Sequence, residues 1–444
     1  MSDLFTFRIY FLTLYKINLV MNIPANNPNL KSWVEVPQNS DFPIQNLPFG
    51  IFRTNQDKER VGVRIGDHVV DLKALFVLGY LENLPFELSD FDNNYLNPLM
   101  KKGKKATRDL RNRISKLLDS TFQDLQKNEH HVSQVLISIE QVTMCMPVQI
   151  GDYTDFYSSR EHATNVGTMF RDPANALLPN WLWIPVGYHG RASSVILSGQ
   201  DIYRPKGQIK PNPEENPIYA PCRNLDFELE TAFITFEGKP LGDSISTEEA
   251  EDFIFGMCLF NDWSARDIQT WEYVPLGPFL SKNFASSISP WIVTMDAMQA
   301  FKCDGPVQEP HVLSYLEFEG QKSYDINLTV YIQPENGEEN LISTSNLKYM
   351  YWNMAQQLTH HTVNGCNVRC GDLMGSGTIS GPTPDSYGSM LELAWKGTKP
   401  LKMSDGSERK FIQDLDTVIM RGYCEKDGVR VGFGEVKAKV LPSK

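Results

Sequence analysis

From about residue 150 onward, the sequence consists mainly of short apolar, β-branched runs separated by loops rich in glycine and proline. Few stretches carry the period of a helix, and three of them read as helices: 247–255, 264–272 and 350–363. Ser246 and Glu249 have the spacing of a capping box at the start of the first stretch. Many short strands with such loops are typical of a barrel or roll rather than a parallel sheet. The pattern therefore predicts a mainly β fold with some α.

The residues before this region predict a smaller unit that is also rich in β structure. Two alternating runs flank Gly66-Asp67, which is the signature of a hairpin. A basic, amphipathic stretch over 105–119 predicts a helix. We therefore expect an N-terminal extension and lead-in over 1–40, a small N-terminal domain over 41–147 and a larger domain over 148–444.

The first twenty residues are apolar but are interrupted by Arg8 and Lys16, so the remaining run is too short to cross a bilayer. They also lack the basic start and small-residue cleavage site of a secretory signal. Met21 follows directly, and we expect a downstream start or a dispensable extension rather than a targeting segment. No other segment has the pattern of a membrane span, which predicts a cytoplasmic protein without a membrane partner.

The overall charge narrows the partners of the chain. The 444 residues carry a net charge of −12 and no stripe of Lys or Arg, which argues against a nucleic-acid partner.

The seven cysteines include no C-x-x-C pair, so we expect free thiols in a reducing compartment. The sequence motifs of serine hydrolases, phosphate-loop NTPases and zinc peptidases are also absent from the sequence.

The run DFELE at 226–230 places three carboxylates at every second position. On a regular strand, Asp226, Glu228 and Glu230 would share one face, about 7 Å apart. Such a row is either a solvated strand face or part of a cation site. Asp155 and Asp262 lie in two other acidic segments, so Asp155, Glu228, Glu230 and Asp262 together would offer hard oxygen donors, which suit Ca²⁺ or Mg²⁺.

The segment DYTDFYSSREHATNVG (152–167) concentrates groups that can transfer protons. Ser158 and Glu161 have capping-box spacing, which predicts a helix with His162 in its first turn. The positive end of the helix dipole would keep His162 neutral, the form that a general base needs. The alternative is a histidine that only packs locally.

A second cluster of polar residues lies over 261–273. Arg266, Gln269 and Tyr273 fall on one face of the predicted helix, and Asp262 precedes it as either a functional carboxylate or a simple N-cap. Lys282 follows within an apolar, small-residue stretch and is either a surface residue or a fixed cation. Glu392 lies in an apolar context, where a carboxylate needs a partner.

These segments also carry a resemblance. The runs DYTDFYSSREHATNVG, NLDFELE, NDWSARDIQTWEYVPLGPF and GSGTISGP closely resemble the fumarylacetoacetase family, and the likeness covers roughly 400 residues. It implies an SH3-like N-terminal β-barrel, a catalytic domain built as a mixed β-roll, and a homodimer.

The resemblance also implies a role for individual residues. The calcium ligands would be Asp155, Glu228, Glu230 and Asp262, and Asp262, Lys282 and Ser286 match a second, magnesium-type site. His162 is similar to the proton acceptor of the family and Glu392 to the carboxylate that orients it. The charge-stabilising groups would be Arg266, Gln269 and Lys282. The groups that hold the substrate would be Tyr157, Arg171, Tyr188, Gln269, Tyr273 and Thr378. Asp226 does not match a family ligand.

The sequence departs from the family at one site position. The usual Gly-Thr after SKNF is Ala285-Ser286 here, which keeps a hydroxyl at the second position.

The reaction that the resemblance implies is the metal-dependent hydrolysis of a carbon–carbon bond in the diketo acid 4-fumarylacetoacetate. The products would be fumarate and acetoacetate, in the last step of tyrosine and phenylalanine catabolism. The alternatives are a related acylpyruvate-type hydrolase of the same superfamily and a non-catalytic metal-binding homologue.

Overall fold

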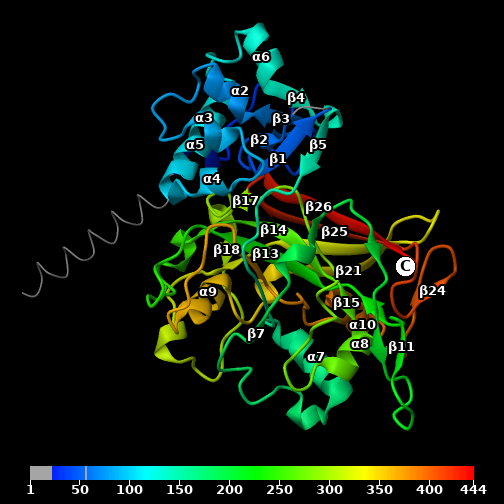
Figure 1. The fold of residues 1–444 in the computed structure, drawn as a ribbon. Coiled ribbons are helices and arrows are strands. Elements are labelled where there is room, and N and C mark those ends of the chain that lie inside the picture. Colours follow the sequence, from blue (N-terminus) through cyan, green and yellow to red (C-terminus); the bar gives the residue numbers. More distant parts are fainter. Residues whose placement is uncertain (1–22, 56–57) are drawn as a thin grey trace, which may run out of the picture.

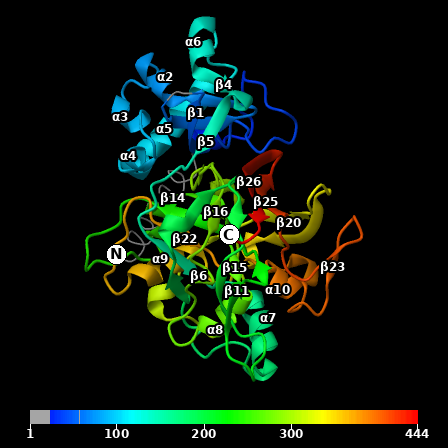
Figure 2. The same cartoon turned by 45° about the vertical axis from the view of Figure 1, so that its right-hand side comes forward.

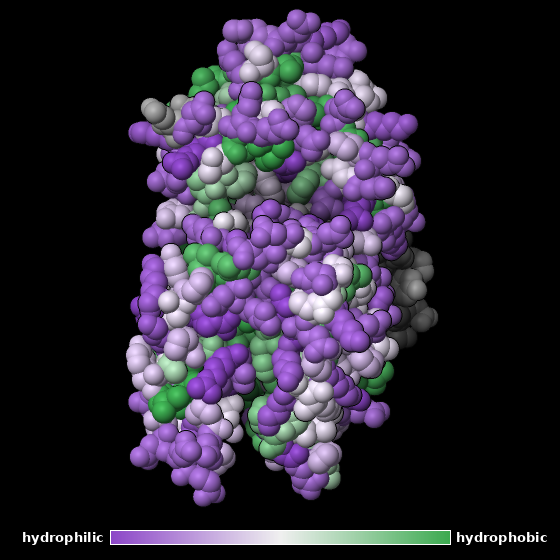
Figure 3. All heavy atoms as spheres, turned by 90° about the vertical axis from the view of Figure 1, so that its right-hand side faces the viewer, coloured by the Kyte–Doolittle hydropathy of each residue, from purple (hydrophilic) through white to green (hydrophobic). Residues whose placement is uncertain are grey.

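The computed structural model describes residues 23–55 and 58–444, so the prediction about the first twenty residues lies outside the described residues. A smaller N-terminal region sits on one end of a larger region (Figure 1). The face seen in Figure 3 is mostly hydrophilic, with small scattered apolar groups. Among the described residues, no helix is both long and apolar enough to cross a membrane.

The N-terminal region is built on an antiparallel sheet with the strand order β4-β3-β2-β1-β5. Its strands are β1 (Phe49–Thr54), β2 (Arg60–Ile65), β3 (His68–Asp71), β4 (Leu136–Ser138) and β5 (Val142–Cys145). The predicted hairpin is confirmed, because Ile65 pairs with His68 across a turn in which Gly66 has φ +48°. The pairing of the described residues leaves β4 and β5 as separate edges, so the SH3-like barrel is not confirmed and stays a prediction.

Helices cover one side of this sheet, and Figure 1 shows them in blue and cyan beside β1 to β3. They are α2 (Leu72–Val77), α3 (Leu88–Phe91), α4 (Asn97–Met100), α5 (Gly103–Leu118) and α6 (Glu129–Val135). The helix predicted over 105–119 is confirmed as α5. Its buried Leu110, Ile114 and Leu117 recur at the spacing of one helix face, which explains why this basic segment folds against the sheet.

The larger region contains a mixed sheet with the order β7-β6-β22-β13-β14-β16-β8. Its strands are β6 (Tyr153–Phe156), β7 (Gly187–His189), β8 (Val195–Leu197), β13 (Leu229–Thr235), β14 (Ile254–Asp262), β16 (Ser286–Ile288) and β22 (Leu373–Gly375), and β17 (Val293–Thr294) pairs with β14 beside this path. The pairs β22–β6 and β16–β8 are parallel and the other pairs are antiparallel. Every residue of β13 and β14 is buried, which fits their nearly continuous apolar sequence.

A second sheet packs against the first, with the order β21-β20-β25-β26-β9. Its strands are β9 (Ile202–Tyr203), β20 (Asn327–Gln333), β21 (Asn340–Asn346), β25 (Thr417–Lys426) and β26 (Val429–Leu441). Leu259 of β14, Leu328 of β20 and Met420 of β25 belong to the shared hydrophobic core. The fold is therefore mainly β with some α, as the sequence predicts.

Four short strand pairs complete the larger region. They are β10 (Lys206–Ile209) with β11 (Ile218–Pro221), β12 (Leu225–Asp226) with β15 (Ser264–Ala265), β18 (Lys302–Cys303) with β19 (Ser323–Tyr324), and β23 (Leu401–Lys402) with β24 (Glu408–Arg409). The run DFELE is therefore not one strand. It breaks at Phe227-Glu228, because β12 pairs with β15 whereas β13 pairs with β14.

The helix predictions in this region have different outcomes. The stretches 264–272 and 350–363 contain α8 (Arg266–Glu272) and α9 (Met354–Thr362), although Asn353 caps α9 later than expected. The helix over 247–255 is wrong, since only a single 3-10 turn forms at Ala250–Asp252. Its apolar residues from Ile254 onward belong instead to β14, where the sheet buries them on both faces.

Candidate active site

The structure brings four carboxylates from the large sheet together in one buried cluster. Asp155 is on β6, Glu228 on the link before β13, Glu230 on β13 and Asp262 at the end of β14. One ligand oxygen of each lies within 4.8 Å of those of the others. All four predicted calcium ligands thus meet, and Asp262 is not an N-cap, because Ala265 precedes the first turn of α8. We call this group the acidic cluster.

A glycine allows two of these carboxylates to approach each other. Gly375 of β22 lies between β6 and β13 and pairs with Asp155 on one side and with Ala232 on the other. A Cβ at this position would lie 2.7 Å from Asp155 Oδ1 and 3.0 Å from Glu230 Oε2. Only glycine leaves the space that the two carboxylates occupy.

Two cations stabilise one half of the acidic cluster. Lys282 Nζ contacts Glu228 Oε2 and lies 2.8 Å from Asp262 Oδ2. Arg266 Nη2 lies 2.9 Å from Glu228 Oε1. Burial alone would raise the pKa of Glu228, but the charges of Lys282 and Arg266 outweigh it and lower this pKa. Conversely, burial opposes the charge of Lys282, but Asp262 and Glu228 outweigh it and raise the lysine pKa. Lys282 is therefore a fixed cation rather than a surface residue.

The other half of the acidic cluster has no such compensation from the protein. Asp155 Oδ1 and Glu230 Oε1 are buried and have no hydrogen-bond partner among the described residues. Burial raises the pKa of Asp155 and that of Glu230 well above the ordinary values. The next cause is a neighbouring carboxylate, which is Asp262 for Asp155 and Asp155 for Glu230. Buried carboxylates normally have a partner. Since all the converging donors are carboxylate oxygens, the residues fit a hard divalent cation.

Two hydroxyl groups bind Asp262 next to the acidic cluster. Ser286 Oγ donates to Asp262 Oδ1 over 2.7 Å, and Tyr188 Oη donates to Oδ2 over 2.9 Å. Ser286 of β16 is opposite Asp262 of β14 in the sheet, which explains the contact. Lys282 and Ser286, which the resemblance places with Asp262 at a magnesium-type site, thus both contact the carboxylate of Asp262.

A histidine and a carboxylate form a second buried pair. His162 Nδ1 lies 2.6 Å from Glu392 Oε2, and only 2% of His162 is exposed. Glu392 also accepts hydrogen bonds from Asn165, Ser380 and Ser389. Although burial alone would raise the pKa of Glu392, its contact with His162 and these hydrogen bonds lower it. An ionised Glu392 only accepts hydrogen bonds, so His162 carries a proton on Nδ1 and donates it to Glu392.

The helix of His162 is α7 (Arg160–Phe170), and Ser159 caps it by accepting a hydrogen bond from His162 N over 3.1 Å. The predicted cap at Ser158 is wrong by one residue. Ser158 Oγ instead accepts a hydrogen bond from Gln357 Nε2 over 2.8 Å, so this hydroxyl holds α9 rather than the start of α7. His162 still falls in the first turn, as predicted.

Three further predicted residues, Gln269, Tyr157 and Thr378, differ in their contacts with the site residues described so far. Gln269 Oε1 accepts from Arg266 Nη1 over 3.2 Å. The ring of Tyr157 stands edge-on to His162 at 5.2 Å. Thr378 is buried, and its hydroxyl has no hydrogen-bond partner among the described residues.

Two predicted substrate-binding residues lie at the surface. Arg171 is exposed at the end of α7, where its guanidinium donates to the carbonyl of Ala176. Tyr273 is exposed at the end of α8. No hydrogen bond joins either side chain to another predicted site residue within the described ranges.

Sequence reasoning did not identify the groups that hold Glu392. The spacing of Ser389 and Glu392, S-x-x-E, is a capping-box pattern that could have drawn attention to α10 (Met390–Leu393). Ser380 belongs to the run GSGTISG, which also contains Gly377, whose N–H donates to Glu230 Oε2 over 2.9 Å. Asn165 lies three residues after His162, on the same face of α7, and this spacing could have identified it from the sequence as a neighbour of His162.

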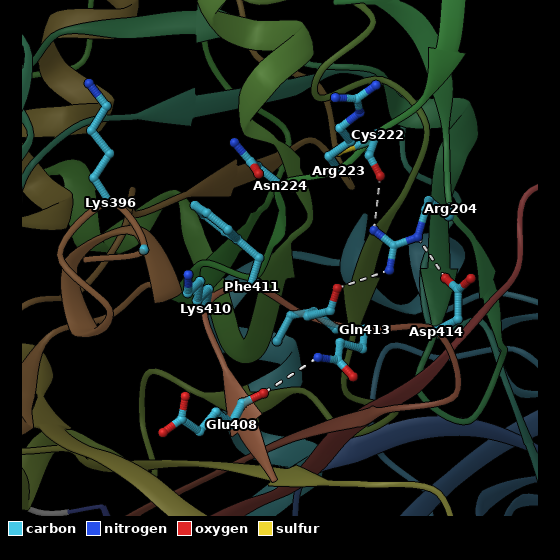
Figure 4. A pocket seen from close by; sticks show the side chains of 12 residues that line it. Arg204, Cys222, Arg223, Asn224, Lys396, Glu408, Lys410, Phe411, Gln413 and Asp414 are labelled. Atoms are coloured by element: carbon cyan, nitrogen blue, oxygen red, sulfur yellow. Dashed lines mark hydrogen bonds and ion pairs between the residues drawn. The ribbon is translucent and has the colours of Figure 1, made fainter. Parts of the chain in front are cut away.

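A cavity with polar and charged walls lies elsewhere. It has a volume of about 800 Å³ and is partly lined by Arg223, Lys396 and Phe411, and none of the predicted site residues line it (Figure 4). Arg204 at its wall is already held by Asp414 and by the carbonyls of Cys222 and Ile412. The candidate active site is therefore identified by side chains that converge on one place, and not by the volume of a cavity.

Comparisons with known proteins show the family of the chain. A family model described as fumarylacetoacetate (FAA) hydrolase C-terminal matches residues 152–441, and one described as fumarylacetoacetase N-terminal matches residues 45–147. The chain is 52% identical to fumarylacetoacetase of Dictyostelium discoideum over 93% of this chain and 98% of that protein. It is 51% identical to fumarylacetoacetase of Homo sapiens over 93% and 99%, and 51% identical to that of Caenorhabditis elegans over 93% and 100%. The chain belongs to the fumarylacetoacetate hydrolase family.

Proposed function

We propose that this protein hydrolyses the carbon–carbon bond between the fumaryl and acetoacetyl parts of 4-fumarylacetoacetate. Water adds its oxygen to the fumaryl carbonyl, the bond to the next carbon breaks, and its electron pair leaves on acetoacetate as an enolate that is then protonated. The products are fumarate and acetoacetate. The names of relatives about half identical over nearly the whole chain support this reaction.

His162 is the proposed base. Because Nδ1 is held by Glu392 at 2.6 Å, the lone pair of Nε2 is free to take a proton from the attacking water. Glu392 keeps the ring in this tautomer and stabilises the imidazolium that forms. The hydrogen bonds that Glu392 accepts from Asn165, Ser380 and Ser389 keep this carboxylate fixed while the charge changes.

Arg266, Gln269 and Lys282 are proposed to stabilise the negative charge that develops on the substrate oxygens. Arg266 Nη2 pairs with Glu228 Oε1 at 2.9 Å, and because this nitrogen carries two N–H groups, one of them is left for the substrate. A donor that is fixed in place before the reaction lowers the barrier by typically a few kcal/mol.

The acidic cluster is proposed to hold Ca²⁺, with Asp155, Glu228, Glu230 and Asp262 as ligands. Lys282 and Ser286 beside Asp262 are proposed to border a magnesium-type site. A divalent cation held by these residues would supply Lewis-acid stabilisation of negative charge on the substrate oxygens. The two orphaned oxygens of Asp155 and Glu230 support the proposal, because they are the atoms that need a positive partner.

Six residues are proposed to hold the substrate: Tyr157, Arg171, Tyr188, Gln269, Tyr273 and Thr378. Thr378 offers a free buried hydroxyl, and Tyr157 stands against His162. Arg171 and Tyr273 would close over the substrate from the ends of α7 and α8. These two helices lie together near one end of the larger region (Figure 2).

A cytoplasmic homodimer is the proposed form of the protein. The exposed apolar side chains of Val274, Leu276 and Phe279, which are 67%, 97% and 67% exposed, support a surface that a second copy covers.

The observation that carries the proposed function is the 2.6 Å contact of His162 with Glu392 in a chain that also assembles the acidic cluster. The test is a steady-state assay of the full chain on fumarylacetoacetate and on an acylpyruvate, with and without a chelator. We expect turnover of fumarylacetoacetate that a chelator removes and Ca²⁺ or Mg²⁺ restores. Faster turnover of the acylpyruvate would assign the chain to a related hydrolase, and no turnover of either would make it a metal-binding homologue.

A further inference from the structure

Asp226 starts the acidic run DFELE, but its oxygens contact different groups from those of Glu228 and Glu230. Its side chain is fully buried. Oδ2 accepts hydrogen bonds from Arg266 Nε over 2.8 Å and from Leu391 N over 3.0 Å, and Oδ1 accepts one from Met390 N over 2.7 Å. Asp226 therefore has three donors of its own and is not one of the converging oxygens of the acidic cluster.

The two amides belong to the first turn of α10 (Met390–Leu393), the short helix that carries Glu392. The first N–H groups of a helix have no acceptor within the helix. A helix of four residues has too few internal hydrogen bonds to fix its own direction. By accepting both N–H groups, Asp226 ties the start of α10 to strand β12, 164 residues earlier in the chain.

Arg266 provides the third donor. Its guanidinium is planar, so a hydrogen bond to Nε fixes where both Nη groups point. Nη1 then meets Gln269 at 3.2 Å, and Nη2 lies beside Glu228. The same carboxylate thus sets the direction of the group that we expect to stabilise the oxyanion.

We propose that Asp226 is a positioning residue, which holds the guanidinium of Arg266 and the helix of Glu392 in fixed relation to each other. Through these contacts it sets the distance between the proton-accepting pair His162–Glu392 and the charge-stabilising Arg266. This inference rests on the proposed function. The oxygens of Asp226 are taken up by Arg266, Met390 and Leu391, and Asp226 is not one of the converging ligands.

The role predicts a specific kinetic effect. Reacting groups that are misplaced by about 1 Å can lose roughly 10²-fold in rate, although substrate still binds. In Asp226→Asn, the amide can no longer accept from both Arg266 and the two N–H groups, so both anchored groups shift. We expect kcat to fall by roughly 10²-fold. KM and the dissociation constant of Ca²⁺, measured by calorimetry, should change by less than about threefold.

Asp416 offers a matched control. It is also a buried aspartate, it accepts two hydrogen bonds from Arg409 and one from Gln413 N, and it has no contact with the candidate active site in the described residues. Asp416→Asn should lower the thermal midpoint about as much as Asp226→Asn but keep kcat within about twofold. The double variant Asp226→Asn/Glu392→Gln should lose less than the product of the two single losses, because both residues act in one unit.

Hydrogen exchange of the wild-type protein tests the anchor without relying on activity. The amides of Met390 and Leu391 should be protected nearly as strongly as those of β13, although first-turn amides of such a short helix ordinarily exchange fast. Exchange at the rate of exposed amides would overturn the proposal, and this result decides the case if Asp226→Asn does not fold.

The other outcomes are also distinct. An unchanged kcat in folded Asp226→Asn, a loss that excess Ca²⁺ restores, or an equal loss in Asp416→Asn would each refute the positioning role. If the wild-type protein does not hydrolyse fumarylacetoacetate, the proposed function fails, and hydrogen exchange alone then decides whether Asp226 anchors α10.

Discussion

Arg111 on α5 and Glu230 on β13 are both fully buried charges, but their surroundings differ. Arg111 donates to the carbonyls of Asn46 and Gln45 and to the side chain of Asn26. Glu230 accepts one hydrogen bond from Gly377 N, and its second oxygen has no protein partner among the described residues. In the N-terminal region the protein itself satisfies the buried charge, whereas the acidic cluster leaves charge for something else to satisfy.

The pKa values follow this difference. Burial lowers the pKa of Arg111 to about 10, which leaves it protonated at neutral pH. Burial and neighbouring carboxylates raise the pKa of Glu230 and Asp155 well above their ordinary range, so the charged form is disfavoured without a cation. A buried charge that the fold leaves without a partner is thus a candidate functional group.

The largest effect expected is that of His162→Ala. The variant removes the proposed base, so kcat should fall by about 10³-fold. Calcium affinity should stay at the wild-type level, since His162 is not one of the converging ligands. Kinetics and calorimetry on the same preparation check both statements, and wild-type turnover in this variant would remove His162 from the mechanism.

Glu230→Gln sharpens the comparison within the acidic cluster. The amide removes a ligand charge, so calcium affinity and activity should both fall by at least about tenfold. The same change removes a carboxyl group whose charged form burial disfavours, so the metal-free protein should become more stable. Glu228→Gln should have the opposite effect on the metal-free protein, because it removes the carboxylate that Lys282 and Arg266 share and leaves each with one ion pair, at a cost of about 3 kcal/mol.

Chemical denaturation of both variants in the presence of a chelator measures this difference. Equal changes in the free energy of unfolding would show that the two halves of the acidic cluster do not differ as described.

The pH dependence of the metal-free protein tests the raised pKa values. Unfolded Asp and Glu ionise near pH 4, but folded Asp155 and Glu230 keep their protons to higher pH. Their contribution to stability is therefore fully present below about pH 4 and is lost as pH rises through the folded pKa. Ions bind the deprotonated form. The gap in thermal midpoint between calcium-loaded and chelated protein should widen from about pH 5 to about pH 8, and a constant gap would contradict these shifts.

Much of the acidic cluster could be predicted from the sequence, because the residue types limit the chemistry and the quoted runs carry the family resemblance. The fold class could also be predicted, since short apolar runs between glycine and proline are a local signal. The break in DFELE could not, because it depends on which distant strands pair with β12 and β13. For the same reason the partners of Asp226 were missed, as Met390 lies 164 residues away. The helix prediction over 247–255 was wrong because pairing within the sheet, rather than local propensity, determines the conformation of Ile254 and Phe255.

Arg111→Met tests the N-terminal region, in which protein groups bind the buried guanidinium of Arg111. The variant leaves the carbonyls of Gln45 and Asn46 buried without their donor, so the free energy of unfolding should fall by about 2 kcal/mol. The kcat of the folded variant should be unchanged, since α5 packs in the N-terminal core. Urea denaturation and the steady-state assay measure the two quantities. A loss of kcat without loss of stability would mean that this region takes part in catalysis.

The smallest effect expected is that of Ser286→Thr, which restores the hydroxyl residue usual in the family. Ser286 Oγ donates to Asp262 Oδ1 over 2.7 Å, and a threonine can make the same bond if its methyl group fits. The strand position favours this, because β16 is extended and β-branched side chains suit strands. We expect affinities for Ca²⁺ and Mg²⁺ within about threefold of wild type, whereas Ser286→Ala should weaken Mg²⁺ binding more, since an acceptor on buried Asp262 then loses its donor. Equal magnesium affinities for the serine, threonine and alanine forms would show that this hydroxyl plays no part in holding the ion.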